Sequence, residues 1–206
     1  RAAGNFAEAE AIYKAAWKKT PTSPLLSAYT QSMEAQGKFE ASRAVITQWL
    51  KGNPTDGSAK FMLMVNSIAT GKYKEALTEG LALQKDRPTD VALLNNLAWL
   101  HDKTGDLAKA TQLAEQAYAQ SPRTPEIVDT LGWLLVRGQK LERGAKFLKA
   151  AYDMAPRNPE IAYHHAYALK QAGKVAEAKT VLSTALQNPQ PFVERKDAET
   201  FLKTLN

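Results

Sequence analysis

The sequence predicts an all-α solenoid of stacked helical hairpins, because three series of residues recur at one spacing. Prolines follow one another at steps of 33 or 34 residues, at Pro21, Pro54, Pro88, Pro122, Pro156 and Pro189. Glycines recur in phase with the prolines, at Gly4, Gly37, Gly71, Gly105, Gly138 and Gly173. Small residues form the third series, at Ala9, Ser42, Ala76, Ala110, Gly144 and Ala178. A hairpin of this length cannot bury its apolar face alone, so neighbouring hairpins must stack and share a core.

Each unit is expected to contain two amphipathic helices of about thirteen residues, with apolar positions near the helical period. The first helix runs from a proline to the next glycine, and the second runs from that glycine to the following proline. Ser23, Thr124 and Asn158 each precede a proline, and we expect them to cap first helices. Glycine can take the positive φ that reverses the chain between the two helices. We expect this conformation at Gly37, Gly71, Gly105 and Gly173.

The three series predict one repeat domain. Residues 1–22 are expected to form the second helix of a half unit, and full units follow at 23–56, 57–90, 91–124, 125–158 and 159–190. Residues 191–206 are expected to form the polar-backed helix that caps a solenoid. We therefore expect a chain that starts inside a repeat, after a removed N-terminal segment, and ends at its native C-terminus.

Small residues are expected where the two helices of a unit cross. Two helices approach closely only where neither carries a bulky side chain. The small residues of three first helices match small residues twelve positions later in the second helices, in the pairs Ala98 and Ala110, Gly132 and Gly144, and Ala166 and Ala178. Larger apolar residues are expected to fill the rest of this seam, at Leu94, Leu97, Leu131, Leu135, Phe147, Leu148, Leu169 and Leu182.

The repeat resembles the tetratricopeptide (TPR) repeat over essentially the whole chain. The resemblance rests on the 34-residue spacing and on two sets of signature residues, Leu97-Ala98, Gly105, Ala110, Ala117 and Pro122, and Leu131-Gly132, Gly144, Ala151 and Pro156. The sequence departs from the pattern at Ser42, Trp49 and Gly80, which affects local packing only. The resemblance implies a right-handed superhelix of antiparallel helix pairs whose first helices line a concave face.

Composition excludes several classes of protein. The chain has 206 residues, a net charge of +6 and no cysteine, which excludes disulfides, thiolate metal sites and cysteine nucleophiles. The longest apolar runs, at 61–65 and 131–136, are far shorter than the roughly 20 residues that cross a bilayer. Lys and Arg are dispersed along the chain, whereas a nucleic-acid-binding protein gathers them in a stripe. We expect neither a transmembrane segment nor a nucleic-acid partner.

No catalytic residue, metal ligand or cofactor is expected. The sequence holds no glycine-rich phosphate loop, no G-x-S-x-G elbow and no H-E-x-x-H pair. The histidines His101, His164 and His165 fall on first helices, and the adjacent pair points about 100° apart. Structural or groove-lining roles are therefore favoured over a metal site, which needs three or four converging ligands.

The concave face is the candidate binding surface. Two columns of inward residues are expected to cross it, Gln31, Val65, Trp99, Trp133 and Tyr167 in one, and Ser27, Phe61, Asn95, Asp129 and Tyr163 in the other. Three cationic residues are expected near the ends of the first helices, Lys103, Arg137 and Lys170. The resulting prediction is a ligand groove over residues 91–172, formed by Asn95, Trp99, Lys103, Asp129, Trp133, Arg137, Tyr163, Tyr167 and Lys170.

The aromatic column allows two interpretations, a ligand-binding surface or packing between repeats, because aromatic residues at helical spacing more often belong to a core. Trp99 and Trp133 project about 200° away from the seam residues Leu97 and Leu131, which favours exposure. Exposed Trp and Tyr beside polar side chains are typical of recognition hot spots. Such a surface suits an extended peptide, a partner helix or a sugar chain. The carboxylate clamp of chaperone-binding TPR modules is not expected, because the two columns do not match its Lys and Asn pattern.

A narrower resemblance covers the C-terminal part of the chain, residues 91–206. The runs LNNLAWL at 94–100, DTLGWLL at 129–135 and PEIAYH at 159–164 are similar to bacterial TPR lipoproteins associated with exosortase/PEP-CTERM protein sorting and exopolysaccharide production. The resemblance implies a non-catalytic, periplasm-facing envelope scaffold, lipid-anchored upstream of this chain, that binds a protein or peptide or else a polysaccharide. The alternative is a substrate-recruiting TPR arm of a larger enzyme such as a glycosyltransferase. The alternative location is the cytoplasm.

Overall fold

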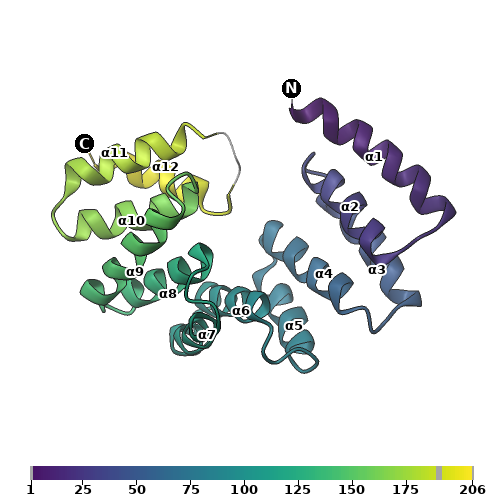
Figure 1. Ribbon diagram of the computed structural model, residues 1–206, viewed down its shortest axis with the longest axis horizontal. Coiled ribbons are helices and arrows are strands. Elements are labelled where there is room, and N and C mark those ends of the chain that lie inside the picture. Colours follow the sequence, from purple (N-terminus) through teal and green to yellow (C-terminus); the bar gives the residue numbers. More distant parts are fainter. Residues whose placement is uncertain (1, 189–191, 206) are drawn as a thin grey trace. The chain divides into compact units, whose positions relative to one another are not determined.

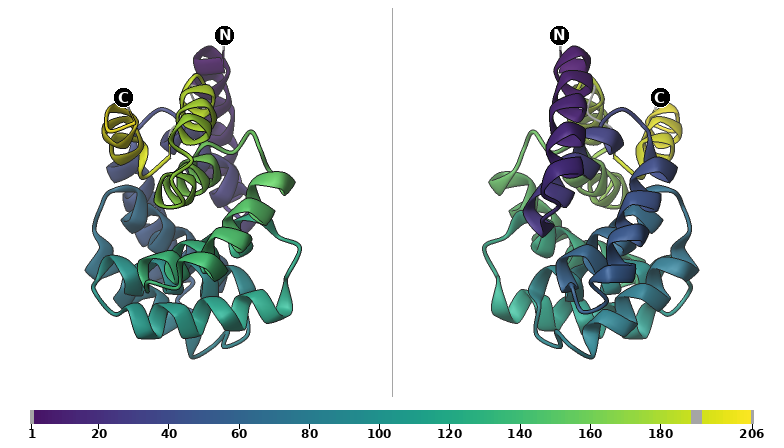
Figure 2. Two further views of the ribbon diagram at one scale, coloured as in Figure 1. Left: turned by 90° about the vertical axis from the view of Figure 1, so that its left-hand side faces the viewer. Right: turned by 90° about the vertical axis from the view of Figure 1, so that its right-hand side faces the viewer.

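The computed structural model describes residues 2–188 and 192–205, and within these ranges it consists of twelve α-helices without a strand. Figures 1 and 2 show consecutive helices of each part of the chain lying side by side and running in opposite directions. The helices are α1 (Ala2–Lys19), α2 (Ser23–Glu34), α3 (Phe39–Gly52), α4 (Gly57–Ala69), α5 (Tyr73–Gln84), α6 (Val91–Lys103), α7 (Leu107–Gln120), α8 (Pro125–Arg137), α9 (Leu141–Met154), α10 (Pro159–Gln171), α11 (Val175–Leu186) and α12 (Arg195–Lys203). The predicted all-α class is confirmed.

The chain divides into two compact units, residues 1–93 and 94–206, with the boundary inside α6. In the C-terminal unit, α12 packs on α10 and α11, where Ala198 and Leu205 join a core that includes Leu182 (Figure 1). The predicted step at Pro189 and the two ends of the predicted capping helix, at 191 and 206, lie outside the described residues. No helix in the described ranges has the length and apolar character that a membrane crossing requires.

The core of the N-terminal unit accommodates one departure from the repeat pattern. Leu26 and Ile46 are fully buried at its centre. Trp49, where other units carry alanine, packs against Trp17 with ring centroids 5.4 Å apart. Its indole N–H donates to Asp56 Oδ2 at 2.8 Å. The bulky side chain is therefore satisfied between α1 and the start of α4.

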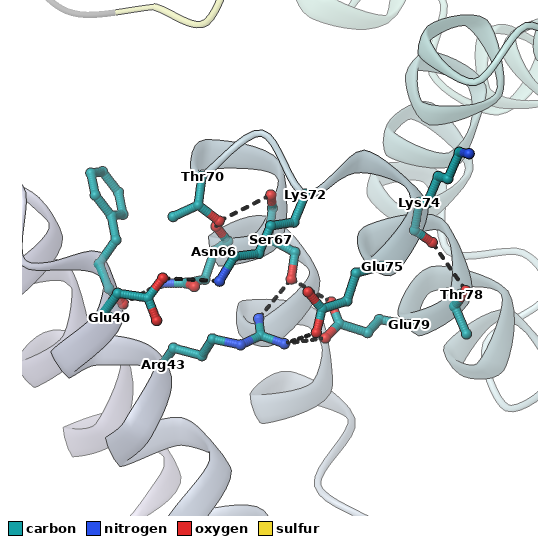
Figure 3. Close-up of polar contacts among 11 residues, drawn as sticks. Glu40, Arg43, Asn66, Ser67, Thr70, Lys72, Lys74, Glu75, Thr78 and Glu79 are labelled. Carbon is teal, nitrogen blue, oxygen red and sulfur yellow. Dashed lines mark hydrogen bonds and ion pairs between the residues drawn. The ribbon is translucent and has the colours of Figure 1, made fainter.

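A polar network joins the helices of the N-terminal unit across the repeat boundary (Figure 3). The guanidinium of Arg43 on α3 donates to Ser67 Oγ at 2.7 Å, and it donates to the carboxylates of Glu75 and Glu79 at 2.6 and 3.0 Å. Ser67 Oγ in turn donates to Glu79 Oε2 at 2.8 Å. Because one guanidinium contacts α4 and α5 together, it fixes the position of α4 relative to both neighbouring helices.

A close helix crossing lies in the C-terminal unit, between α8 and α9. A Cβ atom added to Gly144 would lie 2.7 Å from the carbonyl oxygen of Gly132, and one added to Gly132 would lie 2.9 Å from the backbone nitrogen of Leu148. Both distances are shorter than van der Waals contact allows. The predicted crossing of small residues is confirmed at this pair.

Turns and caps follow the predictions with two exceptions. The four expected glycines have φ between 73° and 96°, and the α8–α9 turn instead places Gln139 at φ 62°. Asn158 caps α10 by accepting from the backbone N–H groups of Glu160 and Ile161. The cap of α2 is Thr22 rather than Ser23, because the helix starts one residue earlier than predicted. Thr124 occupies the N-cap position of α8, but its side chain makes no capping hydrogen bond.

Candidate functional site

Three of the predicted groove residues, Asp129, Trp133 and Tyr163, contact a buried histidine, His164. Its ring lies between two carboxylates, with Nδ1 2.7 Å from Asp129 Oδ2 and Nε2 2.7 Å from Glu194 Oε2. Burial alone would lower the pKa of His164, but the charge of Asp129 and the hydrogen bonds to both carboxylates raise it to about 10. His164 is therefore an imidazolium held between two anions.

Glu194, which lies just before α12, connects the C-terminal segment, residues 192–205, to His164. Its carboxylate accepts hydrogen bonds from both His164 and Lys103. Burial would raise the pKa of Glu194, but the hydrogen bond and charge of His164, together with Lys103, lower it to about 2. A second ion pair, between Arg137 Nη1 and Asp102 Oδ2 at 2.9 Å, links α8 to α6.

Aromatic rings enclose the histidine. The indole of Trp133 stacks on the His164 ring, with centroids 4.2 Å apart, and it meets Tyr167 edge-on at 5.1 Å. Tyr163 lies 6.0 Å from Trp133, and Phe201 of α12 covers Tyr163 and Tyr167. These rings form a packed layer beneath the C-terminal segment.

This packing overturns one expectation and leaves another untested. Trp133 is only 8% exposed, so the prediction that its ring projects into solvent is wrong. The ring packs with Leu148 of α9 and is covered by His164 and Tyr167 of α10. Whether the predicted groove residues bind a ligand stays a prediction.

The predicted groove residues differ in burial. Asp129, Trp133 and Tyr163 are buried, and Arg137 is exposed. The ammonium group of Lys170 donates to Thr204 Oγ1 and lies over the Phe201 ring. The remaining predicted residues are half-buried, namely Asn95, Trp99, Lys103 and Tyr167.

Sequence reasoning missed Glu194, because it lies outside the repeating units. It also missed the pairing of His164 with Asp129, because the repeat spacing does not identify contacts between adjacent repeats. The signal that could have suggested the pairing is a shared position. Asp129 and Tyr163 occupy one column, and His164 directly follows Tyr163.

The N-terminal unit carries an open groove instead. It has a volume of about 550 Å³ and lies between α2, α4 and the start of α6. Its residues include the N-terminal members of the two predicted columns, Ser27, Gln31, Phe61 and Val65. These positions in the N-terminal unit line a hollow, whereas Asp129, Trp133 and Tyr163 in the C-terminal unit are buried.

The groove is lined by apolar side chains of α4 and by polar side chains of α2. Phe61, Met62 and Val65 of α4 are half-buried. On α2, the Gln31 amide donates to Ser27 Oγ at 3.0 Å. Glu34 also lines the groove.

The carboxylate of Glu34 is held in a fixed position at the end of the groove. Its Oε1 accepts from Ser42 Oγ at 2.7 Å and from Asn66 Nδ2 at 2.8 Å. Arg87 and Asp90, which also line the groove, form an ion pair at 2.9 Å. The charged groups that line the groove therefore comprise two carboxylates and one guanidinium.

Comparison with known proteins identifies the class of repeat. One tetratricopeptide repeat family model matches residues 1–65 and 135–192, and a second matches residues 67–125. The chain therefore belongs to the tetratricopeptide repeat family. Both matched models describe TPR repeats, which generally form non-catalytic scaffolds for protein–protein interaction, and neither describes a catalytic domain.

Solved structures support the same fold. A thermophilic TPR protein of Thermus thermophilus matches with a TM-score of 0.72 and 19% identity over 89% of this chain and 98% of that chain. A TPR protein of Parabacteroides merdae matches with a TM-score of 0.72 and 17% identity, over 98% of this chain and 80% of that chain. MamA of Desulfovibrio magneticus matches with a TM-score of 0.63 and 17% identity, over 84% of this chain and 96% of that chain. No curated protein matches the chain. At these identities the likeness concerns the fold alone.

Proposed function

We propose that this chain is a non-catalytic scaffold that binds an extended peptide of a partner protein in the groove of the N-terminal unit. The observation that carries the proposal is the open groove itself, with apolar Phe61 and Val65 on α4 and hydrogen-bonding Gln31 on α2. Its volume falls within the range of pockets that hold small ligands or a few side chains. An apolar peptide side chain would pack against the apolar side chains of α4, and the peptide backbone would pair with the side chains of α2.

The charge of the groove narrows the choice of peptide. The carboxylates of Glu34 and Asp90 outnumber the single guanidinium of Arg87. Because charge complementarity governs partner selection, the favoured peptide carries a basic side chain beside its apolar residue. Phe61 is the one aromatic residue among the described residues that line the groove, and this scarcity of aromatic faces supports a peptide over a polysaccharide.

Peptide display on the purified chain, followed by calorimetry with the best binder, tests this proposal. Gln31→Trp would fill the groove and weaken binding at least tenfold. Gln48→Trp adds the same ring at an exposed position of α3 that does not line the groove, and it would leave the affinity unchanged. Replacing the basic residue of the peptide by Gln would also weaken binding. Equal affinity of both Trp variants would refute the groove as the site.

We further propose that the scaffold works in the bacterial envelope, anchored to a membrane by a lipid on a segment upstream of residue 1, and takes part in exopolysaccharide production or protein sorting. Support comes from the motifs at 94–100 and 129–135. Fractionation and lipid labelling of the full-length gene product in its host test the proposal. Recovery in the cytosol would favour the cytoplasmic alternative, and a fused catalytic domain would favour the enzyme arm.

A further inference from the structure

The cluster below the C-terminal segment contains three converging side chains that peptide binding in the N-terminal groove does not use. Glu160, His164 and Glu194 each offer one ligand atom, and these atoms all lie within 4.8 Å of one another. Glu160 and His164 are four residues apart on α10 and so share one face of the helix. Glu194 approaches from the segment before α12.

The orientation of His164 is that of a metal ligand. Its Nδ1 faces Asp129 Oδ2 at 2.7 Å, so Nε2 points toward the two glutamates. Histidines that bind metals through one ring nitrogen almost always donate the other N–H to a carboxylate, which sets the tautomer and the ring orientation. Asp129 is placed for that role, and the stacked Trp133 ring holds the imidazole plane in position.

Two carboxylate oxygens close to these ligands are also buried. The side chain of Asp129 is 6% exposed, and its Oδ1 has no hydrogen-bond partner among the described residues. Oδ1 of Asp102 is also buried without a partner in the described ranges. Buried carboxylate oxygens normally require a donor or a cation.

Four carboxyl groups, at Asp102, Asp129, Glu160 and Glu194, lie near His164, together with the cations Lys103 and Arg137. Burial raises the pKa of Asp102 and of Glu160, and a metal ion bound beside them would favour their ionised forms.

We propose that Glu160, His164 and Glu194 bind a divalent transition-metal ion, with Zn²⁺ as the best fit, and that Asp129 orients His164 for this purpose. Imidazole nitrogen and carboxylate oxygen are common zinc donors, and three protein ligands leave a fourth position for water. Tetrahedral bonds of about 2.0–2.1 Å separate the donor atoms by roughly 3.3 Å. His164 Nε2 and Glu194 Oε2, now 2.7 Å apart, would move slightly apart, and the ion would replace the proton between them.

The ion would also affect the stability of the fold. It would join α10 to the segment that leads into α12, which are otherwise connected here by the hydrogen bond between His164 and Glu194. Metal ions that bind the folded protein stabilise it by mass action. The C-terminal segment would thus be fastened more firmly when the metal is bound.

Calorimetric titration of the EDTA-treated and dialysed chain with ZnCl₂ is the first test. The expected result is one bound ion per chain and a higher unfolding temperature. Glu160→Gln removes one ligand, and it keeps the fold because the Glu160 side chain makes no hydrogen bond among the described residues. This variant would bind Zn²⁺ at least tenfold more weakly. Glu142→Gln, which removes an exposed charge from α9, would bind as the parent does.

Nitrogen NMR of the His164 ring gives a readout that general destabilisation would not change. With Zn²⁺ bound, Nε2 would lose its proton and shift to the metal-bound range, while Nδ1 would stay protonated against Asp129. The proposal fails if both ring nitrogens stay protonated at pH 7 in excess Zn²⁺. It also fails if Glu160→Gln and Glu142→Gln bind the ion equally well, because the binding would then be adventitious.

Discussion

The indole of Trp133 stacks on the imidazole of His164, with planes 12° apart and ring centroids separated by 4.2 Å. The two residues come from α8 and α10, the first helices of successive repeats. When His164 carries a proton, the contact is also a cation–π interaction. Together with the two carboxylates on His164, this pair makes the centre of the C-terminal unit both aromatic and ionic.

Trp133→Ala is expected to lower the free energy of unfolding by about 3–5 kcal/mol, as large-to-small aromatic changes in a core do. The ring is buried by His164, Tyr163 and Tyr167, so its removal leaves a cavity. Urea unfolding followed by circular dichroism measures the loss. Trp99→Ala, at a half-buried position, would lose less. Equal losses for the two variants would mean that the cluster adds nothing to the stability of the unit.

The free energy of unfolding of the metal-free C-terminal unit is expected to fall on both sides of neutral pH. The pKa of His164 rises from 6.5 to about 10 on folding, so its contribution is complete below pH 6.5 and is lost as pH rises toward 10. The pKa of Glu194 falls from 4.5 to about 2, so its contribution is complete above pH 4.5 and is lost as pH falls toward 2. The charged groups around this pair are Asp102, Lys103, Asp129 and Glu160.

Urea unfolding between pH 3 and 10 in the presence of EDTA measures this dependence. His164→Gln keeps a polar side chain but cannot titrate, so its stability would change less between pH 7 and 10 than that of the parent. A parent protein with constant stability over that interval would contradict the raised pKa of His164. Glu142→Gln serves as the control, because this exposed residue lies outside the cluster.

The repeat architecture was predictable because it is written in local spacing. Prolines, glycines and small residues each report on one hairpin, and the Gly132–Gly144 crossing follows directly from two small residues twelve positions apart. Hairpin turns likewise need positive φ at the expected glycines. Such constraints act within one repeat, so a single sequence shows them.

The arrangement of the candidate sites depends on contacts between successive repeats, and the repeat spacing does not reveal these contacts. The burial of Trp133 depends on α10 of the next repeat, and the charge balance of His164 depends on Glu194, which lies outside the repeats. The N-terminal groove was not predicted, although Ser27 and Gln31, which line it, belong to the two predicted columns. Small polar side chains are a weaker sequence signal for a binding site than tryptophan is.

Gly144→Ala is expected to lower the free energy of unfolding by about 1–3 kcal/mol, the usual effect of overpacking. The new Cβ would lie 2.7 Å from the carbonyl oxygen of Gly132 and 2.8 Å from the backbone nitrogen of Val136, and neither backbone atom can move freely. Gly52→Ala is the matched control, because its Cβ would meet nothing within 4 Å. That control should be neutral or stabilising by about 0.5–1 kcal/mol, since alanine favours the helix. Thermal unfolding of both variants distinguishes these outcomes, and equal behaviour would contradict the close crossing.

Arg43→Met is expected to destabilise the N-terminal unit by about 1–3 kcal/mol, because it leaves partly buried acceptors without their donor. The Arg43 side chain bonds Ser67, Glu75 and Glu79, and methionine preserves only its packing (Figure 3). Arg43→Lys would restore part of the loss, since an ammonium cannot reproduce the geometry of the guanidinium. The comparison variant is Lys149→Met, which removes the exposed ion pair between Lys149 and Asp153 and should change the free energy of unfolding by less than about 1 kcal/mol. Urea unfolding of the three variants decides the matter, and if Arg43→Met loses no more than Lys149→Met, the network does not hold α3, α4 and α5 together.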